Sequence, residues 1–430
     1  MNKNTNVTGS EFTRLGVAPS ISTALTNLKI ITPTPIQRQA IPVALQGKDL
    51  VGVAQTGTGK TLAFGLPMIQ RLNQVNGQGL IILPTRELAI QVDEELRKVA
   101  GKLGLKTAVL IGGTNQRPQV KALNQRPHII VATPGRLNDL LEQKVVRLNQ
   151  IKIAVLDEAD RMLDMGFAPQ IRKVFQHLPA DRQTMLFSAT LAPEIMKMAT
   201  NYLKIPIRIE VAPAGTVAAN LTQEIFIISK LDKVRLVDKL LEQYHGSTLV
   251  FTRTKFGAKK LARSIRDMGH TAAEIHSNRS LSQRQDAIQG FKSGKYRILV
   301  ATDIASRGID VSGIELVLNF DLPTNAEDYV HRIGRTARAG GSGHAISLAT
   351  PDQRHDLRDI EKLIKKNIDI SPLPPLPANR PSLAPISRDP QDFRSNRGSS
   401  RFQGRRSSNS RQSKFSSRPP RRGRPSRFSH

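Results

Sequence analysis

The first residues that could do chemistry lie at positions 54–61, which read AQTGTGKT. An apolar run, LVGVA, precedes them, and a helical pattern, LAFGLPMIQRL, follows them. The stretch matches the phosphate-loop pattern GxxxxGKS/T, except that Ala54 replaces the first glycine. Backbone N–H groups at such a strand-to-helix turn bind phosphates, and the helix N-terminus adds positive potential. A glycine-rich turn without a ligand is the alternative, which the flanking strand and helix patterns disfavour.

Two side chains of this loop have a specific chemical role. Lys60 is expected to reach the β- and γ-phosphates of a nucleotide, and the Thr61 hydroxyl to coordinate Mg²⁺. The residues expected to bind the nucleotide here are Ala54, Gln55, Thr56, Gly57, Thr58, Gly59, Lys60 and Thr61.

A second stretch, AVLDEAD at 154–160, ends an apolar run in three carboxylates within four positions. Acids this close repel one another, so we expect something cationic to face them. Ligands of parallel α/β sheets bind at the carboxyl ends of strands, where a Mg²⁺–nucleotide would meet these side chains. Asp157 is then expected to hold the metal through water, and Glu158 to orient and deprotonate the water that attacks the γ-phosphate. A solvated strand-end loop is the alternative, and the phosphate loop argues against it.

The elements that must position these residues alternate between short apolar runs and amphipathic helical patterns. The runs are LVGVA, GLIILP, HIIVATP, IAVLDEAD and TMLFSAT in the first half, and TLVFTRT, YRILVATD and IELVLNFD in the second. This alternation predicts an α/β fold with parallel sheets flanked by helices. We expect an ATP-binding domain at 1–210, a linker at 211–220, a second α/β domain at 221–370 and a disordered tail at 371–430.

The composition limits the compartment and the partners. Lys and Arg outnumber Asp and Glu by 64 to 35 over 430 residues, which gives a net charge of +29. This excess favours a polyanionic partner, either nucleic acid or an anionic membrane surface. The sequence has no cysteine, no apolar run of the roughly 20 residues that span a bilayer, and no signal-peptide pattern at its start. It predicts a cytoplasmic protein without a membrane span.

Seven motifs in a fixed order make the chain resemble the DEAD-box RNA helicases. They are AQTGTGKT, PTRELA (84–89), TPGR (133–136), DEAD, SAT (188–190), ATDIASRGID (301–310) and HRIGRTAR (331–338). Upstream, PTPIQ (33–37) looks like the end of the family's Q motif, with Phe12 at the expected distance before it. The stretches TRTKFGAKKLA and IHSNRS look most like the bacterial RhlE-type subgroup.

The resemblance implies two RecA-like domains that close around ATP and one RNA strand. Phe12 and Gln37 would line the adenine site, with the Gln37 amide pairing with the adenine edge, and Asp310 would contact the ribose. Contacts to RNA would come from Thr85, Arg86, Gly113, Thr133 and Arg136 in the first domain and from Arg253, Arg284 and Thr302 in the second.

The resemblance also implies roles that link the two halves of the chain. Ser188 and Thr190 would couple the nucleotide state to the grip on RNA. The helical pattern DYVHRIGRTAR places His331, Arg335 and Arg338 on one face. Both arginines would act as arginine fingers at the γ-phosphate, although surface arginines on a helix are ordinarily only solvated. His331 would order the domain interface near Asp160.

Three positions depart from the family pattern. Lys29 and Ile30 replace the usual glycine and aromatic residue before PTPIQ, which predicts weaker stacking on adenine. Leu281 replaces the glutamine often found three residues before Arg284, which removes one polar RNA contact. Ala54 is common in the family.

The tail combines arginines with four phenylalanines at 393, 402, 415 and 428. Residues 380–430 hold fourteen Lys and Arg against two Asp, and therefore contribute +12 of the charge. Charge interleaved with aromatic rings suits RNA binding without sequence preference. A purely solubilising tail is the alternative, and no amphipathic helix supports membrane binding.

These observations together predict an ATP-dependent RNA helicase that locally separates short duplexes and remodels RNA or ribonucleoprotein. ATP and Mg²⁺ are the expected cofactors, and the protein is expected to act as a monomer. Ribosomal or RNA-degradation assemblies are candidate partners. The alternatives are an ATP-gated RNA clamp, an ATP-independent RNA annealer that acts through the tail, and a DNA helicase.

Overall fold

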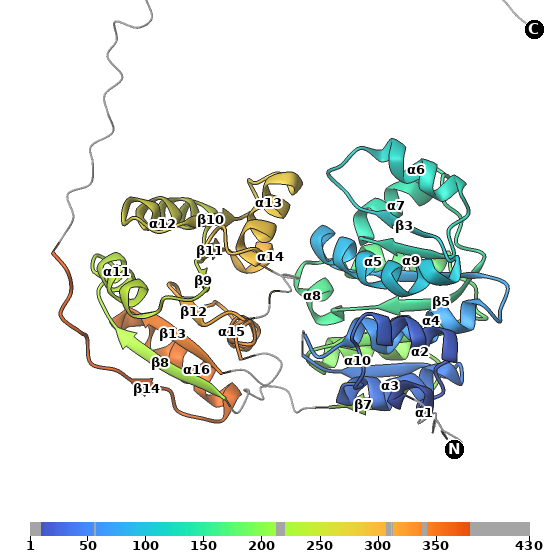
Figure 1. Ribbon diagram of the computed structural model, residues 1–430, viewed down its shortest axis with the longest axis horizontal. Coiled ribbons are helices and arrows are strands. Elements are labelled where there is room, and N and C mark those ends of the chain that lie inside the picture. Colours follow the sequence, from blue (N-terminus) through green and yellow to red (C-terminus); the bar gives the residue numbers. More distant parts are fainter. Residues whose placement is uncertain are drawn as a thin grey trace, which may run out of the picture. The chain divides into compact units, whose positions relative to one another are not determined.

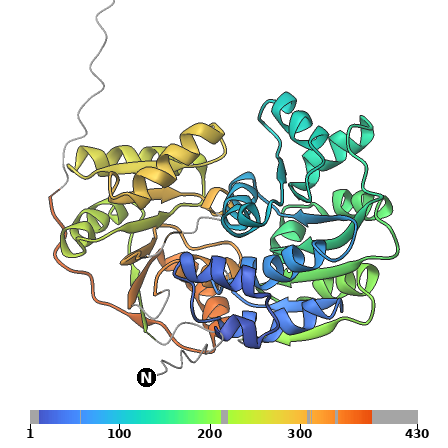
Figure 2. The same ribbon diagram turned by 45° about the vertical axis from the view of Figure 1, so that its right-hand side comes forward.

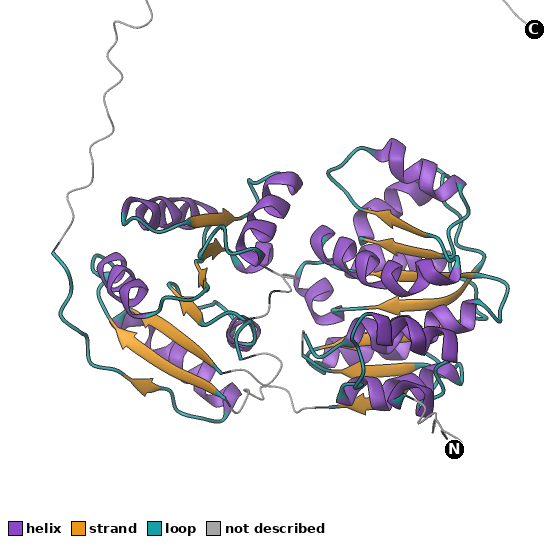
Figure 3. Cartoon of the chain, viewed as in Figure 1, coloured by secondary structure: helices purple, strands orange, loops and turns teal. Residues whose placement is uncertain are grey.

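The computed structural model describes residues 10–55, 57–211, 220–306, 311, 313–337 and 342–378. Several positions named above lie outside these ranges: Thr56, Asp310, Arg338, residues 212–219 of the expected linker, and the tail from 379. Figures 1 and 3 show that the described chain forms two sheets, each flanked by helices.

The first sheet contains seven parallel strands in the order β3-β4-β2-β5-β6-β1-β7 among the described residues. The strands are β1 (Leu50–Val53), β2 (Gln78–Ile82), β3 (Thr107–Leu110), β4 (Ile129–Ala132), β5 (Ile151–Leu156), β6 (Gln183–Ser188) and β7 (Ile207–Glu210). Five of them were predicted as apolar runs, whereas β3 and β7 were not. A strand buried on both faces reads as a continuous apolar run, which is the pattern of parallel sheets covered by helices.

Helices cover both faces of the first sheet (Figures 1 and 2). One apolar core includes side chains of α1 (Glu11–Arg14), α2 (Pro19–Asn27), α3 (Pro35–Leu45), α4 (Lys60–Leu72) and α5 (Arg86–Ala100), the last continued by a 3₁₀ turn at Gly101–Leu103. Against the other face pack α6 (Gln116–Asn124), α7 (Pro134–Glu142), α8 (Ala159–Asp164), α9 (Ala168–Gln176) and α10 (Pro193–Tyr202). Alternate strand residues supply the two cores, as the two-residue period of a strand requires.

The second sheet also has seven parallel strands among the described residues, in the order β10-β11-β9-β12-β13-β8-β14. They are β8 (Leu221–Ile227), β9 (Thr248–Phe251), β10 (Ala272–Ile275), β11 (Ile298–Ala301), β12 (Leu316–Asn319), β13 (Gly343–Ala349) and β14 (Asp369–Ile370). Its helices are α11 (Lys233–Gln243), α12 (Lys255–Asp267), α13 (Leu281–Lys292), α14 (Asp303–Ser306), α15 (Ala326–Ile333) and α16 (Arg354–Ile364), with a 3₁₀ turn at Pro351–Gln353. The two sheets confirm the predicted fold class of two RecA-like α/β domains.

The segment 371–378 was assigned to the disordered tail from its proline content, but the structure holds it on the second sheet. The Ser371 N–H donates to the Ile225 carbonyl at 2.9 Å. The Arg235 guanidinium donates to the carbonyls of Pro377 and Leu376 at 2.7 and 3.4 Å. Leu376 also packs against the core beneath α11 and α12. Proline lacks an N–H but keeps its carbonyl acceptor, so an extended proline-rich segment can still be fixed by a donor from a neighbouring helix.

None of the helices in the described ranges is long and apolar enough to cross a membrane.

Candidate nucleotide and nucleic-acid site

Three adjacent strands bring the nucleotide motifs to one edge of the first sheet. β6 pairs in parallel with both β5 and β1, so the carboxyl ends of all three point the same way. Residues 54–61 follow β1, the acidic stretch 157–160 follows β5, and the motif 188–190 closes β6. Sequence order scatters these motifs over more than a hundred residues, and the parallel pairing brings them together.

The phosphate loop is shaped by two glycines and one side chain. Gly57 and Gly59 have φ values of 86° and 88°, a conformation that favours glycine. The Thr58 hydroxyl donates to the Gln55 carbonyl at 2.7 Å, which closes the turn. Gly59 caps α4, and Lys60 is the first residue of that helix. This is the geometry in which free N–H groups at a helix start bind phosphate.

Gln37 braces this loop from helix α3. Its Nε2 donates to the Gly59 carbonyl at 2.9 Å, and its Oε1 accepts from the Thr34 N–H at 3.0 Å. A Cβ atom at Gly59 would overlap the Gln37 amide, so both the φ angle and the close approach require glycine there. No sequence pattern indicated this contact, and pairing of Gln37 with adenine stays a prediction.

We expect Gln37→Ala to erode the preference for ATP over GTP and to raise the Michaelis constant for ATP about tenfold. An amide can match the donor and acceptor of adenine but not those of guanine, and tenfold is the typical effect of losing one buried hydrogen bond. Steady-state hydrolysis with both nucleotides measures the two effects. Arg38→Ala, at an exposed neighbour on α3, is the control. Unchanged nucleotide selectivity in Gln37→Ala would refute the adenine-reading role.

Lys60 and Asp157 face each other inside the protein. Lys60 Nζ lies 3.9 Å from Asp157 Oδ1, and each side chain is 5 % exposed. The Lys60 ammonium makes no hydrogen bond with the described residues. A buried ammonium without acceptors is costly unless an anion satisfies it, and phosphate oxygens would do so. Burial raises the pKa of Asp157 to about 6, against the attraction of Lys60 and with added repulsion from Glu158.

Glu158 lies next to this pair in an uncommon backbone conformation. Its φ and ψ are 53° and 50°, in the left-handed region. The carboxylate is buried, and its Oε2 lies 3.5 Å from the Arg161 guanidinium. Burial alone would raise its pKa, but the positive charges of Arg161, Lys60 and Arg335 hold the pKa of Glu158 below its usual value. Glu158 is therefore ionised at neutral pH, as a proton acceptor must be.

Asp160 joins the acidic stretch to the motif at the end of β6. Its Oδ2 accepts from the backbone N–H groups of Ala189 and Thr190 at 2.9 and 3.2 Å. The Thr190 N–H also lies 3.4 Å from the Ser188 hydroxyl oxygen. These bonds connect the acidic stretch to residues 188–190, and the coupling role of Ser188 and Thr190 stays a prediction.

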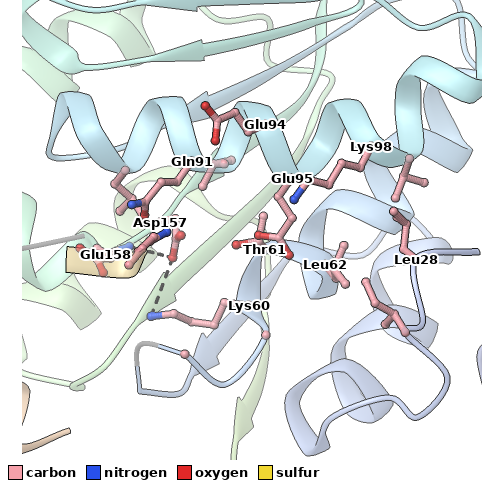
Figure 4. Close-up of a pocket in the computed structure, with 17 residues that line it drawn as sticks. Leu28, Lys60, Thr61, Leu62, Gln91, Glu94, Glu95, Lys98, Asp157 and Glu158 are labelled. Atoms are coloured by element: carbon pink, nitrogen blue, oxygen red, sulfur yellow. Dashed lines mark hydrogen bonds and ion pairs between the residues drawn. The ribbon is translucent and has the colours of Figure 1, made fainter. Parts of the chain in front are cut away.

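A cleft of about 410 Å³ opens beside these residues (Figure 4). Its walls include Lys60, Thr61, Asp157 and Glu158, together with residues of α5 that the sequence did not single out: Gln91, Glu94, Glu95 and Lys98. Leu28 and Ile30 close one end of the cleft, where the departure from the family pattern occurs. Phe12 is instead fully buried in the apolar core and is not among the lining residues.

We expect Ile30→Phe to lower the Michaelis constant for ATP and to leave the maximal rate similar. Ile30 lines the cleft, and an aromatic ring there would stack on the base without changing the groups near the phosphates. The gain should be about two- to tenfold, which corresponds to roughly 0.5–1.5 kcal/mol for an aromatic contact. Ile31→Phe, at the exposed neighbouring position, is the control. An unchanged or raised constant would show that Ile30 does not contact the base.

The raised pKa of Asp157 predicts a pH-dependent demand for Mg²⁺. Below pH about 6 the carboxyl group binds a proton that a metal ligand must lose, so proton and Mg²⁺ compete. The Mg²⁺ concentration that half-saturates ATP hydrolysis should therefore rise about fivefold between pH 6 and pH 5. Mg²⁺ titrations of the ATPase at several pH values measure this shift, with ATP binding in the absence of Mg²⁺ as the control. A flat profile down to about pH 5 would contradict the metal role of Asp157.

The residues expected to contact RNA in the first domain lie at the carboxyl ends of β2, β3 and β4. Thr85 caps α5 three residues after β2 ends, and Thr133 is at the N-cap position of α7 directly after β4. The Arg86 guanidinium lies against Gly113, where φ is 69° and a Cβ atom would overlap it. Arg136 donates to the Thr114 carbonyl at 3.2 Å. The structure therefore gathers all five predicted residues on one edge of the sheet, and their contact with RNA stays a prediction.

The expected RNA contacts of the second domain follow its strands in the same way. Arg253 comes after β9, where its N–H donates to Asp321 Oδ2 at 3.0 Å and its guanidinium to the Leu322 carbonyl at 3.3 Å. Thr302 comes directly after β11, which lies between β9 and β10. Arg284, on α13, forms an ion pair of 3.1 Å with Glu87.

The prediction that His331, Arg335 and Arg338 share one face of a helix is only partly correct. Helix α15 ends at Ile333, so Arg335 lies in the turn that follows rather than on the helix, and Arg338 is outside the described residues. Burial lowers the pKa of His331 well below its usual value, and the charges of Arg161 and Arg335 add to this. His331 is therefore neutral near pH 7, which suits an ordering role better than a charged one.

Arg332, which the sequence analysis did not single out, anchors this turn. It is 2 % exposed, and its guanidinium pairs with both carboxylate oxygens of Asp303, at 2.5 and 2.8 Å. It also donates to Asn319 Oδ1 at 3.1 Å and to the Asp321 carbonyl at 2.6 Å. These bonds fix the start of the turn that carries Arg335.

The chain matches two family models that together cover more than half of its length. Residues 34–198 match the DEAD/DEAH box helicase model, and residues 232–340 match the helicase conserved C-terminal domain. The ATP-dependent rRNA helicase RRP3 of Yarrowia lipolytica is 42 % identical over 84 % of this chain and 76 % of its own length. The DEAD-box ATP-dependent RNA helicase CshA of Geobacillus kaustophilus is 40 % identical over 83 % of this chain and 77 % of its own.

A solved structure agrees with these matches. The structure of S. cerevisiae Dbp5 bound to RNA and ADP BeF3 is 30 % identical, covers 85 % of this chain and 96 % of its own, and has a TM-score of 0.77. The fold, the phosphate loop and the acidic stretch at the end of β5 are thus those of a two-domain nucleotide-driven motor. The chain belongs to the DEAD/DEAH box helicase family.

Proposed function

We propose that this protein uses ATP and Mg²⁺ to grip single-stranded RNA and thereby separate short RNA duplexes locally. Its enzyme class follows from its family: it is an ATP-dependent RNA helicase and an RNA-stimulated ATPase. The observation that carries the nucleotide part is the buried Lys60 ammonium, which has no hydrogen bond among the described residues and faces Asp157 across the phosphate loop.

The residues present fit Mg²⁺ held mainly by phosphates and water. Among the described residues there is no group of three or more acidic, His or Cys side chains that could enclose a metal. Mg²⁺ commonly keeps several waters and takes only one or two protein ligands beside the substrate phosphates. The Thr61 hydroxyl would be a direct ligand, and Asp157 would hold the ion through one of its waters; both residues line the cleft. The bound ion would neutralise the charge that develops on the phosphate oxygens.

The chain's own groups divide the rest of the work. Lys60 donates to the β- and γ-phosphate oxygens, and ionised Glu158 orients the attacking water and accepts its proton. Arg335 and Arg338 supply positive charge at the γ-phosphate, a contribution that reaches about 10³–10⁵ in rate for such arginines. Asp160 couples the nucleotide state at the acidic stretch to residues 188–190, because its carboxylate accepts hydrogen bonds from the backbone N–H groups of Ala189 and Thr190.

The RNA strand is proposed to follow the carboxyl edges of the two sheets. Thr85, Arg86, Gly113, Thr133 and Arg136 would hold its phosphates in the first domain, and Arg253, Arg284 and Thr302 in the second. The likeness to structures solved with RNA and an ATP analogue supports this path. Structured ribosomal RNA is a candidate substrate because four of the relatives are named rRNA helicases.

We further propose that this protein belongs to the RhlE-type subgroup, is located in the cytoplasm and acts as a monomer. The stretches TRTKFGAKKLA and IHSNRS support the subgroup, and the match to bacterial CshA supports the location. A monomer suffices because one chain carries both RecA-like domains.

A strand-displacement assay distinguishes a helicase from an ATP-gated RNA clamp and from an ATP-independent annealer. A short RNA duplex with a single-stranded extension is mixed with the protein and ATP, ADP or no nucleotide, under conditions that require several turnovers. We expect strand release with ATP alone. An RNA clamp would bind the duplex with ATP and release no strand. An annealer would join strands equally well without nucleotide.

A further inference from the structure

One exposed aromatic side chain of the second domain has no role in the activity described so far. Phe256, in the first turn of α12, is 71 % exposed. The other large apolar side chains that are exposed in the described ranges are aliphatic or sulfur-containing: Ile31, Met196, Ile205, Leu231, Ile370 and Leu373. A single exposed aliphatic side chain is ordinary. An exposed aromatic ring beside cations is a different case, because it can bind the face of a planar ligand.

Lysines of helix α12 lie on the same side of the helix as Phe256. Lys255 Nζ lies 5.3 Å from the ring centroid, within the range of a cation–π contact. Lys259 and Lys260 are exposed three and four positions later, on the side of the helix that carries Phe256. Helix α12 contains five Lys and Arg and a single acid, Asp267, at its far end. This surface, Phe256 with Lys255, Lys259 and Lys260, is called the α12 platform below. It combines a ring with excess positive charge.

The platform lies at the same sheet edge as the proposed RNA contacts of this domain. Lys255 Nζ also donates to Asn278 Oδ1 at 3.1 Å, which places the ring beside the loop that follows β10. Arg253 precedes α12 by two residues, and β11, which ends just before Thr302, lies between β9 and β10. Phosphates held by Arg253 and Thr302 would therefore carry their bases past the platform.

We propose that Phe256 stacks on a base of the single-stranded RNA whose phosphates the second domain binds. Every base presents a π face, so such a contact is sequence-tolerant, and the neighbouring lysines favour the polyanion over a neutral surface. The ring is exposed, so a base can reach it without displacing other side chains. This inference rests on the proposed RNA-helicase function.

RNA with and without bases tests the contact directly. Binding of a single-stranded oligouridine and of a base-free oligomer of the same length is measured with a non-hydrolysable ATP analogue. Phe256→Ala should weaken oligouridine binding about 5- to 100-fold, the range for loss of one stacked base. Phe256→Tyr should bind like wild type. Leu231→Ala, at another exposed apolar site of this domain, should change nothing. The base-free oligomer should bind wild type and Phe256→Ala equally.

A fluorescence measurement gives an independent readout, because the sequence contains no tryptophan. In Phe256→Trp the new indole is the sole tryptophan, and RNA should quench its emission by stacking. Leu231→Trp should show no such quenching. Unquenched emission of Phe256→Trp at saturating RNA, or equal RNA affinity of Phe256→Ala and wild type, would overturn the stacking. If wild type itself fails to bind RNA, the proposed function fails rather than the inference alone.

Discussion

Glu158→Gln is expected to lower RNA-stimulated ATP hydrolysis by at least about 10²-fold while ATP and RNA binding survive. Glutamine keeps the size of the side chain and an oxygen that Arg161 can still contact, but its amide cannot accept the proton of the attacking water. Since closure on RNA is released by hydrolysis in the proposed cycle, the ATP-bound RNA complex of this variant should also dissociate more slowly. Phosphate release and RNA dissociation, measured on the same preparation, give both quantities.

Glu94→Gln is the matched control for this substitution. Glu94 lines the same cleft but lies on α5, away from the strand end that carries the acidic stretch. Its substitution should leave turnover within about twofold of wild type, as for most surface changes. Near-normal hydrolysis by Glu158→Gln would remove Glu158 from the role of base.

Removal of residues 379–430 should produce the second large effect, on RNA affinity rather than on turnover. This segment carries +12 of charge and four phenylalanines but none of the ATPase motifs. RNA-saturated hydrolysis should therefore stay near normal, while RNA affinity at moderate salt falls. Each neutralised single-strand phosphate contributes about 0.7 to the slope of log affinity against log salt, so six engaged cations account for roughly 4 units. RNA binding across a salt series, for full chain and truncated protein, measures the difference.

The truncation must begin after Ala378 because residues 371–378 are bonded to the second sheet. A chain that ends at Ser371 also loses Leu376 from the core and the two carbonyls that accept from Arg235. We expect that shorter chain to melt at a lower temperature with the same salt slope as the chain ending at 378. Equal slopes for the full chain and the chain ending at 378 would show that the tail does not hold RNA.

The sequence predicted what depends on local pattern. The phosphate loop requires glycines at fixed spacing between a strand and a helix, and Gly57 and Gly59 have the left-handed φ values that this loop needs. Short apolar runs marked the central strands correctly. The strands at the two edges of the first sheet, β3 and β7, were missed, and in β7, which reads IRIE, charged residues interrupt the apolar pattern.

Tertiary partners could not be predicted in this way. Gln37 bonds to Gly59 across 22 positions, and Arg332 pairs with Asp303 across 29. Both contacts depend on which helix packs beside which strand end. The proline-rich composition of 371–378 predicted disorder for the same reason, since composition does not reveal that Arg235 lies where it can bond the carbonyls of that segment.

At Glu158, whose backbone is left-handed, a substitution that increases the stability of the fold would abolish ATP hydrolysis. A glutamate in this region is strained by roughly 1–2 kcal/mol relative to the right-handed helical region, whereas asparagine and glycine adopt it more readily. Random substitution there would therefore include variants that relax the backbone and cannot hydrolyse ATP. Selection for folding stability alone would replace this glutamate with other residues. Selection for ATP hydrolysis keeps it. Engineering of this protein guided by stability alone should leave position 158 untouched, however favourable its replacements look by melting temperature.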